Sequence, residues 1–130
     1  MKLDGLGLFV KDMAVMTRFY RDVLGFGIKE ADNTTNVYLI KDGTLFLLYR
    51  RNDFEKLVDH KFNYLESISA HGEICLSVEN YTEVDKTYNE VLIKGAVSIL
   101  APTTEPWGQR TCYIADPEGN IIEIGSFVKE

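Results

Sequence analysis

The sequence predicts an α+β protein of two tandem βαβββ modules, whose curved mixed sheet surrounds a concave cavity and carries its helices outside. Two observations predict this fold. A strand-then-helix pattern occurs twice, and short apolar runs separated by turn residues follow each copy. We expect one domain over residues 1–130, with modules over about 3–50 and 71–127 and a linker over 51–70.

The repeat aligns residues 6–27 with residues 74–95 without a gap, at a constant offset of 68. Identical residues stand at matching positions: Leu8 and Leu76, Val10 and Val78, Tyr20 and Tyr88, Val23 and Val91, Leu24 and Leu92, and Gly27 and Gly95. Because a repeat of this kind indicates a duplicated folding unit, we expect both copies to form the same elements.

The first strand of each copy alternates between two faces, as a half-buried strand does. One face carries Leu6, Leu8 and Val10 in the first copy and Ile74, Leu76 and Val78 in the second. The opposite face carries Gly5, Gly7 and Phe9, and Glu73, Cys75 and Ser77. We expect the first set to pack under a helix and the second set to line the concave side.

The helix of each copy is predicted by an i, i+3, i+4, i+7, i+8 stripe of mainly apolar residues. The stripes are Met16, Phe19, Tyr20, Val23 and Leu24, then Val84, Thr87, Tyr88, Val91 and Leu92. Asp12 and Asn80 precede the stripes at the position of an N-cap. Gly27 and Gly95 follow them, as residues that end a helix often do.

Further strands are predicted by short runs over 37–40 and 44–49 in the first copy, and over 98–100, 111–115 and 120–124 in the second. Turn signals separate these runs at Lys41-Asp42-Gly43 and Asp116-Pro117-Glu118-Gly119. The linker carries apolar residues on one side, which predicts a partly helical segment; they are Phe54, Leu57, Val58, Phe62 and Leu65.

Composition excludes several classes of partner. The formal charge is −6, and no basic cluster is longer than Arg50-Arg51, which argues against nucleic acid. The longest apolar run, 45–49, is far too short to cross a membrane, and the start lacks the apolar stretch of a secretory signal. Cys75 and Cys112 stand in apolar runs, as reduced structural thiols do. We therefore expect a cytoplasmic protein with no nucleic-acid or membrane partner.

Two segments resemble the glyoxalase/bleomycin-resistance/extradiol dioxygenase (vicinal oxygen chelate) superfamily. The first is Leu8-Phe9-Val10-Lys11-Asp12 followed by Phe19-Tyr20-Arg21-Asp22-Val23-Leu24-Gly25-Phe26. The second runs from Trp107-Gly108-Gln109-Arg110-Thr111 to Asp116-Pro117-Glu118-Gly119-Asn120-Ile121-Ile122-Glu123-Ile124. The resemblance covers nearly the whole chain. It implies paired βαβββ modules around a ligand cavity, and a homodimer, but it does not choose among the family's activities.

The resemblance also implies where metal ligands would stand, because metal-dependent members usually place two His and two Glu on the first and last strands of the modules. The matching positions here are Gly5, Glu73, Phe46 and Glu123, with Leu47 in place of Phe46 if the register shifts by one. The first module then offers no donor atom, so we expect no intact metal site and no cofactor. An alternative keeps one divalent metal, such as Zn or Ni, on His71, Glu73 and Glu123.

The carboxylates of Glu73 and Glu123 are expected on the concave side, where an unpaired buried acid is costly. They could attract an amine or guanidinium of a ligand, pair with Arg110, or raise each other's pKa, which would make Glu123 a candidate catalytic proton carrier. The full set of candidate ligand-binding residues is Glu73, Glu123, Trp107, Arg110, Phe9, Phe46, Tyr38 and Tyr113.

Three functions follow from these residues. The first hypothesis is a metal-free protein that binds a small molecule, an antibiotic or another cationic or aromatic compound, similar to the bleomycin-resistance proteins. The second is a metal-dependent glyoxalase I-like lyase (lactoylglutathione lyase), or an isomerase or epimerase. The third is an interaction module with a vestigial cavity. Ring-cleaving dioxygenase chemistry is disfavoured because its iron site needs two histidines, which these positions lack.

Overall fold

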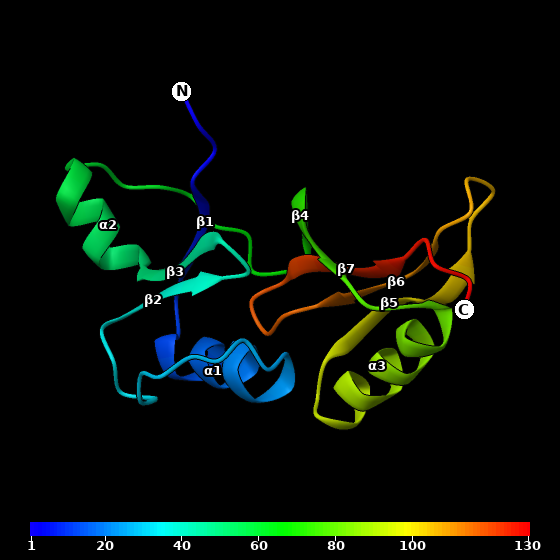
Figure 1. Ribbon diagram of the computed structural model, residues 1–130. Coiled ribbons are helices and arrows are strands. Elements are labelled where there is room, and N and C mark those ends of the chain that lie inside the picture. The colour runs from blue at the N-terminus through cyan, green and yellow to red at the C-terminus, as the bar shows by residue number, and fades with distance from the viewer. The chain divides into compact units, whose positions relative to one another are not determined.

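The computed structural model describes all residues, 1–130, and divides into two compact units, Met1–Tyr64 (unit 1) and Leu65–Glu130 (unit 2). The α+β class and the paired modules are confirmed (Figure 1). The predicted linker, 51–70, is divided by this boundary, because its helix belongs to unit 1 and a strand of unit 2 begins at Ser69. The expectation of a single domain stays a prediction.

Unit 1 holds a three-stranded sheet, sheet A, with the strand order β1-β3-β2. Its elements are β1 (Gly5–Val10), α1 (Met13–Arg18), the π-helical turn η1 (Phe19–Val23), β2 (Asn36–Lys41), β3 (Thr44–Arg50) and α2 (Arg51–Val58). Strand β1 pairs with β3 in parallel, and β2 pairs with β3 antiparallel. The helix α1 lies on one side of the sheet and α2 on the other (Figure 1).

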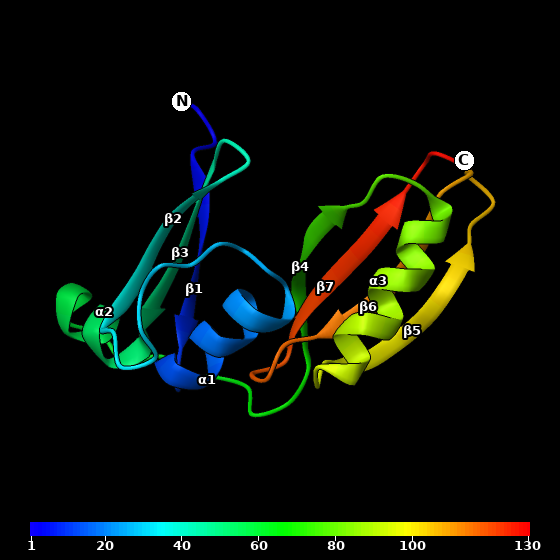
Figure 2. The same cartoon turned by 60° about the horizontal axis from the view of Figure 1, so that its bottom comes forward.

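Unit 2 holds a four-stranded sheet, sheet B, with the order β4-β7-β6-β5. Its elements are β4 (Ser69–Ser77), α3 (Tyr81–Ile93), β5 (Val97–Thr104), β6 (Arg110–Ala115) and β7 (Asn120–Ser126). Strand β4 pairs with β7 in parallel, and the other pairs are antiparallel. The helix α3 runs along one face of this sheet (Figure 2).

Unit 1 departs from the predicted pattern of three strands after the helix. Residues 24–35 form no strand, so sheet A has three strands where sheet B has four. The chain leaves η1 through Gly25 and Gly27, both at positive φ. The acid Asp32 then pairs with Arg18 and Arg21 of the helical segment, so this stretch is held to the helix by side chains.

The predicted caps and buried stripes explain how each helix is held. The Asp12 carboxylate accepts a hydrogen bond from Val15 N at 3.1 Å, and the Asn80 side chain accepts one from Glu83 N at 3.0 Å. Both N-caps are confirmed. The helix-facing strand positions form much of the cores; the most buried include Val10, Val37, Phe46 and Leu48 in unit 1, and Cys112, Ile114, Ile122 and Ile124 in unit 2. Val84 of α3 is also fully buried.

None of the helices is long and apolar enough to cross a lipid bilayer. The longest, α3, has 13 residues, whereas a spanning helix needs about 20.

Candidate functional site

The face of sheet B that points away from α3, here called the open face of sheet B, carries most of the polar residues that the sequence analysis selected. The strand register places three rows across β4, β7 and β6 on this face. The rows are Glu73, Ile121 and Ala115; Cys75, Glu123 and Tyr113; and Ser77, Gly125 and Thr111. Glu123 therefore stands on the middle strand of the three, between Cys75 and Tyr113.

Two donors orient the Glu123 carboxylate. The Tyr113 hydroxyl donates to Oε2 at 2.8 Å, and the Gln109 side-chain amide donates to Oε1 through Nε2 at 3.3 Å. The Trp107 indole N–H in turn donates to Gln109 Oε1 at 3.0 Å. A chain of hydrogen bonds thus connects Trp107, in the loop before β6, to Glu123 on β7.

The hydrogen bond to Glu123 raises the pKa of the Tyr113 phenol well above its usual value, and burial adds to the effect. Tyr113 therefore stays protonated at neutral pH and acts as a donor to the carboxylate. Its position, opposite Glu123 in the ladder between β6 and β7, follows from the register. The tyrosine and the acid form one fixed unit.

Cys75 and Glu73 form a second pair on the same face. The Cys75 thiol donates to Glu73 Oε1, with an Sγ to Oε1 distance of 3.4 Å. Burial, together with the hydrogen bond to Glu73, raises the pKa of the Cys75 thiol to about 11. The thiol is therefore protonated at neutral pH, which makes it a poor nucleophile. This pair adds the Glu73 carboxylate and the polarisable Cys75 sulfur to the open face of sheet B.

Neither acid of the open face is paired with a basic side chain of the chain, because no ion pair includes Glu73 or Glu123. The expectation that Arg110 acts on this face is wrong. Its guanidinium lies on the helix side of β6 and donates to Asp85 of α3 at 2.6 and 2.9 Å, and to Thr104 Oγ1 at 3.0 Å. Arg110 therefore fastens α3 to the sheet.

Neither unit by itself holds the ligand set of a family metal site. Within either unit, no group of three or more His, Cys, Asp or Glu side chains lies close enough together to hold one. The displaced cluster of His71, Glu73 and Glu123, considered as an alternative, is therefore not formed in unit 2. A Cβ at Gly5 would also meet the backbone oxygen and Cβ of Leu45, so this position has no space for a donor side chain.

The register of β3 corrects one candidate residue. Phe46 is only 4% exposed and packs on the helix side, with ring centroids 5.0 Å from Tyr20 and 5.1 Å from Phe26. Leu47 pairs with Gly7 as Glu123 pairs with Cys75, so Leu47 and not Phe46 is the equivalent of Glu123. Phe46 is therefore a core residue.

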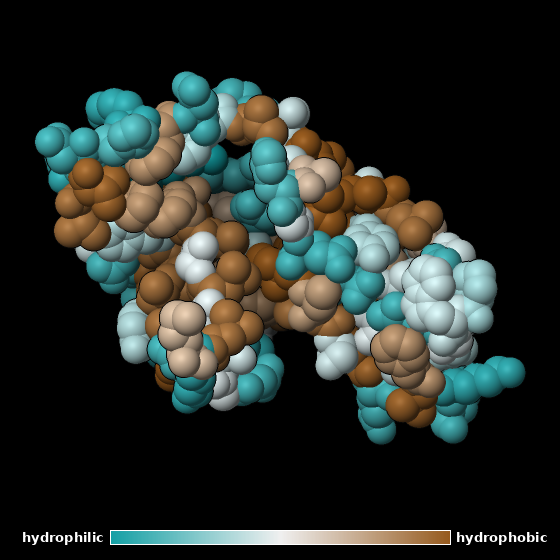
Figure 3. Space-filling view, turned by 90° about the horizontal axis from the view of Figure 1, so that it is seen from above, coloured by the Kyte–Doolittle hydropathy of each residue, from teal (hydrophilic) through white to brown (hydrophobic).

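Two other aromatic candidates lie on the face of sheet A away from α1, the open face of sheet A. The Phe9 ring stacks on Phe54 of α2 with centroids 4.0 Å apart, so α2 covers it in part. Tyr38 is 64% exposed and stands next to Leu47 in the ladder. Apolar side chains also reach the surface in several other places in Figure 3. The candidates of unit 1 therefore supply apolar surface and no carboxylate.

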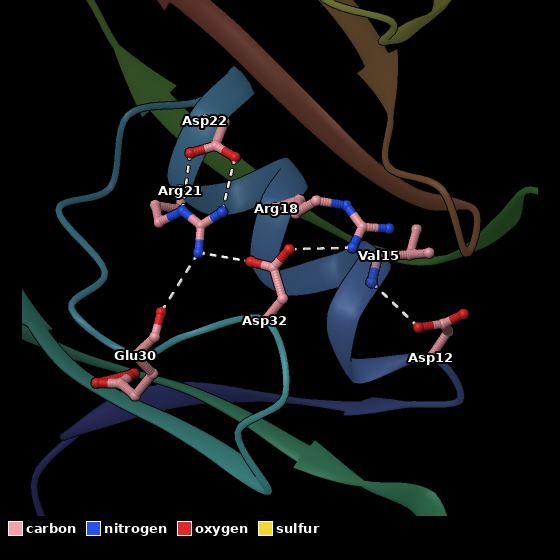
Figure 4. Close-up of polar contacts among 7 residues, drawn as sticks. All are labelled: Asp12, Val15, Arg18, Arg21, Asp22, Glu30 and Asp32. Carbon is pink, nitrogen blue, oxygen red and sulfur yellow. Dashed lines mark hydrogen bonds and ion pairs between the residues drawn. The ribbon is translucent and has the colours of Figure 1, made fainter.

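A second polar cluster, in unit 1, has a structural role (Figure 4). Arg21 donates to both oxygens of Asp22 at 2.8 Å and pairs with Asp32 at 2.7 Å. The hydrogen bond to Arg21 is the main cause that lowers the pKa of each of these two carboxyls. The two arginines, Arg18 and Arg21, are paired with Asp22 and Asp32, so the cluster ties residues 24–35 to the helix and leaves little for a ligand.

The sequence profile of the "Glyoxalase-like domain" family matches residues 4–129. The uncharacterized protein YraH of Bacillus subtilis (strain 168) is 31% identical over 126 residues, which cover 95% of this chain and 97% of that protein. The chain belongs to the glyoxalase-like family. The virulence protein STM3117 of Salmonella typhimurium is 28% identical, over 98% of this chain and 85% of that protein.

Solved structures of glyoxalase-like proteins share the fold. A glyoxalase-related enzyme from Fulvimarina pelagi has a TM-score of 0.82 at 19% identity, covering 96% of this chain and 87% of that one. A lactoylglutathione lyase from Agrobacterium tumefaciens has a TM-score of 0.72 at 21% identity, covering 95% and 92%. At these identities the likeness extends to the fold alone.

Sequence reasoning missed Gln109, which the fold brings to Glu123. One signal for it was available. Gly125 lies inside the last strand, β7, and a glycine inside a strand often marks the close approach of another group. A Cβ at Gly125 would lie 2.7 Å from Gln109 Nε2, so the glycine provides the space in which the amide lies.

Proposed function

We propose that this glyoxalase-like chain binds a small organic cation on the open face of sheet B, with Glu123 as the anchor, without a metal and without chemical conversion. One observation carries the proposal. Glu123 is half-buried and held by two neutral donors, and it has no basic partner in the chain. A cationic ligand would supply the missing charge.

Partial loss of solvation makes Glu123 a favourable partner for a cation. A carboxylate that has lost part of its water is stabilised by a hydrogen-bonded cation, and such charge-assisted bonds contribute about 1.5–3 kcal/mol. Tyr113 and Gln109 hold the carboxylate in one orientation before the ligand arrives, which reduces the entropy lost on binding. Glu73, two residues from Cys75 on β4, adds negative charge to the same face.

The aromatic residues at this site favour a ligand that also carries a ring. The Trp107 side chain is 65% exposed in the loop before β6, and its indole is connected to Glu123 through Gln109. Flat apolar groups and cations both bind well to an indole face. The proposed ligand is therefore a cationic aromatic compound, such as an antibiotic of this kind, and its proposed contacts are Glu73, Glu123, Trp107 and Tyr113.

Isothermal titration with benzamidine, a planar aromatic cation, tests this proposal against the neutral isostere benzamide. We expect binding of benzamidine only, and a loss of about tenfold or more in affinity in Glu123→Gln. Glu90→Gln, which makes the same charge change on the exposed surface of α3, is the matched control and should bind normally. Equal binding of benzamide, or unchanged affinity in Glu123→Gln, would overturn the proposal.

The competing functions give different results in the same preparation. A glyoxalase I-like lyase would isomerise a hemithioacetal when Ni²⁺ or Zn²⁺ is added, and would lose this activity in Glu123→Gln. An interaction module with a vestigial cavity would show no thermal shift with any member of a broad panel of amines. Either result would replace the proposed function.

We also propose that the chain acts as a homodimer in the cytoplasm. The two cysteines support a reducing compartment, since both are free and they occupy opposite faces of sheet B. Light scattering coupled to size exclusion should give twice the 14.8 kDa of one chain. A single-chain mass at micromolar concentration would contradict the dimer.

A further inference from the structure

Gln109 connects the Trp107 ring to the Glu123 carboxylate and leaves a defined set of acceptor positions on that carboxylate. Building on the proposed function, we propose that Gln109 makes the site specific for planar cations with two parallel N–H groups, amidinium or guanidinium, over alkylammonium ions.

The free acceptor positions on Glu123 favour this ligand class. A carboxylate offers about four lone-pair positions, two on each oxygen. The Tyr113 hydroxyl occupies one on Oε2 and the Gln109 amide occupies one on Oε1. One position remains on each oxygen. Two parallel N–H donors match such a pair of oxygens, whereas an ammonium group acts as a point charge.

Trp107 determines which end of the Gln109 amide faces Glu123. An indole N–H can only donate, so the oxygen of the amide must face Trp107. The amide nitrogen is then directed at Glu123 Oε1. The loop that carries Trp107 is itself fixed, since Gly108 O accepts from the Tyr81 hydroxyl at 2.5 Å and Gln109 O accepts from Glu105 N at 2.7 Å.

Gly125 allows the Gln109 amide to lie against β7. A Cβ at this position would lie 2.7 Å from Gln109 Nε2, and 3.3 Å from both the Arg110 backbone oxygen and Thr111 Oγ1, so Gln109 is by far the tightest contact. Gly125 does not have a positive φ. An alanine can therefore adopt the backbone, and the flexible end of Gln109 must move instead. Gly125→Ala thus displaces the amide from Glu123 while leaving both side chains in the protein.

Binding of benzamidine and benzylamine, compared by isothermal titration, tests the inference. We expect the wild-type protein to bind benzamidine about tenfold more tightly, which is the effect of one well-placed charge-assisted hydrogen bond. The preference should fall to about threefold or less in Gln109→Leu and in Gly125→Ala. Asn89→Leu, an equivalent loss of an amide on the exposed surface of α3, should keep it.

The fluorescence of Trp107 provides a second measurement that needs no ligand, because the chain has a single tryptophan. The emission maximum should shift in Gln109→Leu and Gly125→Ala and stay in place in Asn89→Leu, with circular dichroism showing that each variant is folded. Unchanged emission in Gln109→Leu and Gly125→Ala would overturn the hydrogen-bond chain.

The binding results separate the two proposals. A wild-type protein that binds neither amine overturns the proposed function, and the ligand preference with it. A wild-type protein that binds both amines equally, or a Gln109→Leu variant that keeps the preference, overturns only the role of Gln109 and leaves Glu123 as a cation site.

Discussion

The helix-facing sides of the two sheets keep the same chemistry, whereas their open faces have diverged. On the helix side, equivalent strand positions are apolar in both units: Leu8 and Leu76, Phe46 and Ile122, Leu48 and Ile124, and Val37 and Cys112. On the open faces, Gly5 corresponds to Glu73, Gly7 to Cys75, and Leu47 to Glu123. Only Tyr38 and Tyr113 are the same at equivalent open-face positions.

The difference shows which face of a duplicated unit is free to change. A helix-facing position must fill a close-packed core, so both copies are held to similar side chains. An open-face position has no such requirement and is available to bind a ligand. Unit 1 presents apolar groups there, while unit 2 presents two carboxylates and their hydrogen-bond partners. Three predictions test this asymmetry and a fourth tests the ion pairs of unit 1, beginning with the largest effect.

Truncating the matched core residues should be equally damaging in both units. Leu48→Ala and Ile124→Ala each remove a side chain that is at most 1% exposed, and we expect each to lower the free energy of unfolding by about 2–5 kcal/mol. Tyr38→Ala, at a 64% exposed open-face position, should cost less than about 1 kcal/mol. Urea denaturation measures all three, and a large loss for Tyr38→Ala would show that the open face of sheet A is packed.

The two glycines of β1 should differ although both lie on the open face of sheet A. Gly5→Ala places a Cβ against the Leu45 backbone, and overpacking of this kind costs about 1–3 kcal/mol. Gly7→Ala meets Leu47 Cβ at 3.5 Å, an ordinary contact, and should be close to neutral. Thermal unfolding compares the pair. Equal stability would mean that unit 1 can accept a side chain at the position equivalent to Glu73.

The Cys75 thiol should report the charge of the open face of sheet B. Its pKa is raised to about 11 by burial and by Glu73, so alkylation by iodoacetamide should be slow at pH 8. Glu73→Gln removes the nearby negative charge, lowers the pKa and should speed alkylation, by about tenfold for each pKa unit recovered. Peptide mass spectrometry gives the rate. Glu90→Gln is the control, and a rate unchanged in Glu73→Gln would place Glu73 away from the thiol.

The ion pairs of Arg21 with Asp22 and Asp32 should stabilise unit 1 at neutral pH and lose this effect in acid. The guanidinium lowers the pKa of Asp22 and Asp32 in the folded state, so its contribution is present above their ordinary pKa and is lost as the pH falls through the lowered values. Arg21→Gln should therefore lower the melting temperature by a few degrees or less at pH 7 and by less at pH 3. A loss of melting temperature that is larger at pH 3 than at pH 7 would show that these ion pairs do not stabilise the folded state.

Much of the fold was predictable because its signals are local. Each signal involves residues only a few positions apart in the chain. These signals are the strand alternation, the helix stripe, the caps at Asp12 and Asn80, and the turn residues. The way in which residues 24–35 are held to the helix was not predictable in this way. Asp32 pairs there with Arg18 and Arg21, which stand 14 and 11 residues earlier in the chain.

In the candidate site, too, some features follow from the sequence and others only from the tertiary structure. The sequence alone determined that the first module lacks donor side chains and that Glu73 and Glu123 belong to one face of the second, because residue type and strand parity decide both. Only the tertiary structure decided that Phe46 faces the core, that Arg110 turns to Asp85, and that Gln109 reaches Glu123. The reason is that a one-residue change of register moves a side chain to the other face, and register is set by pairing between distant segments.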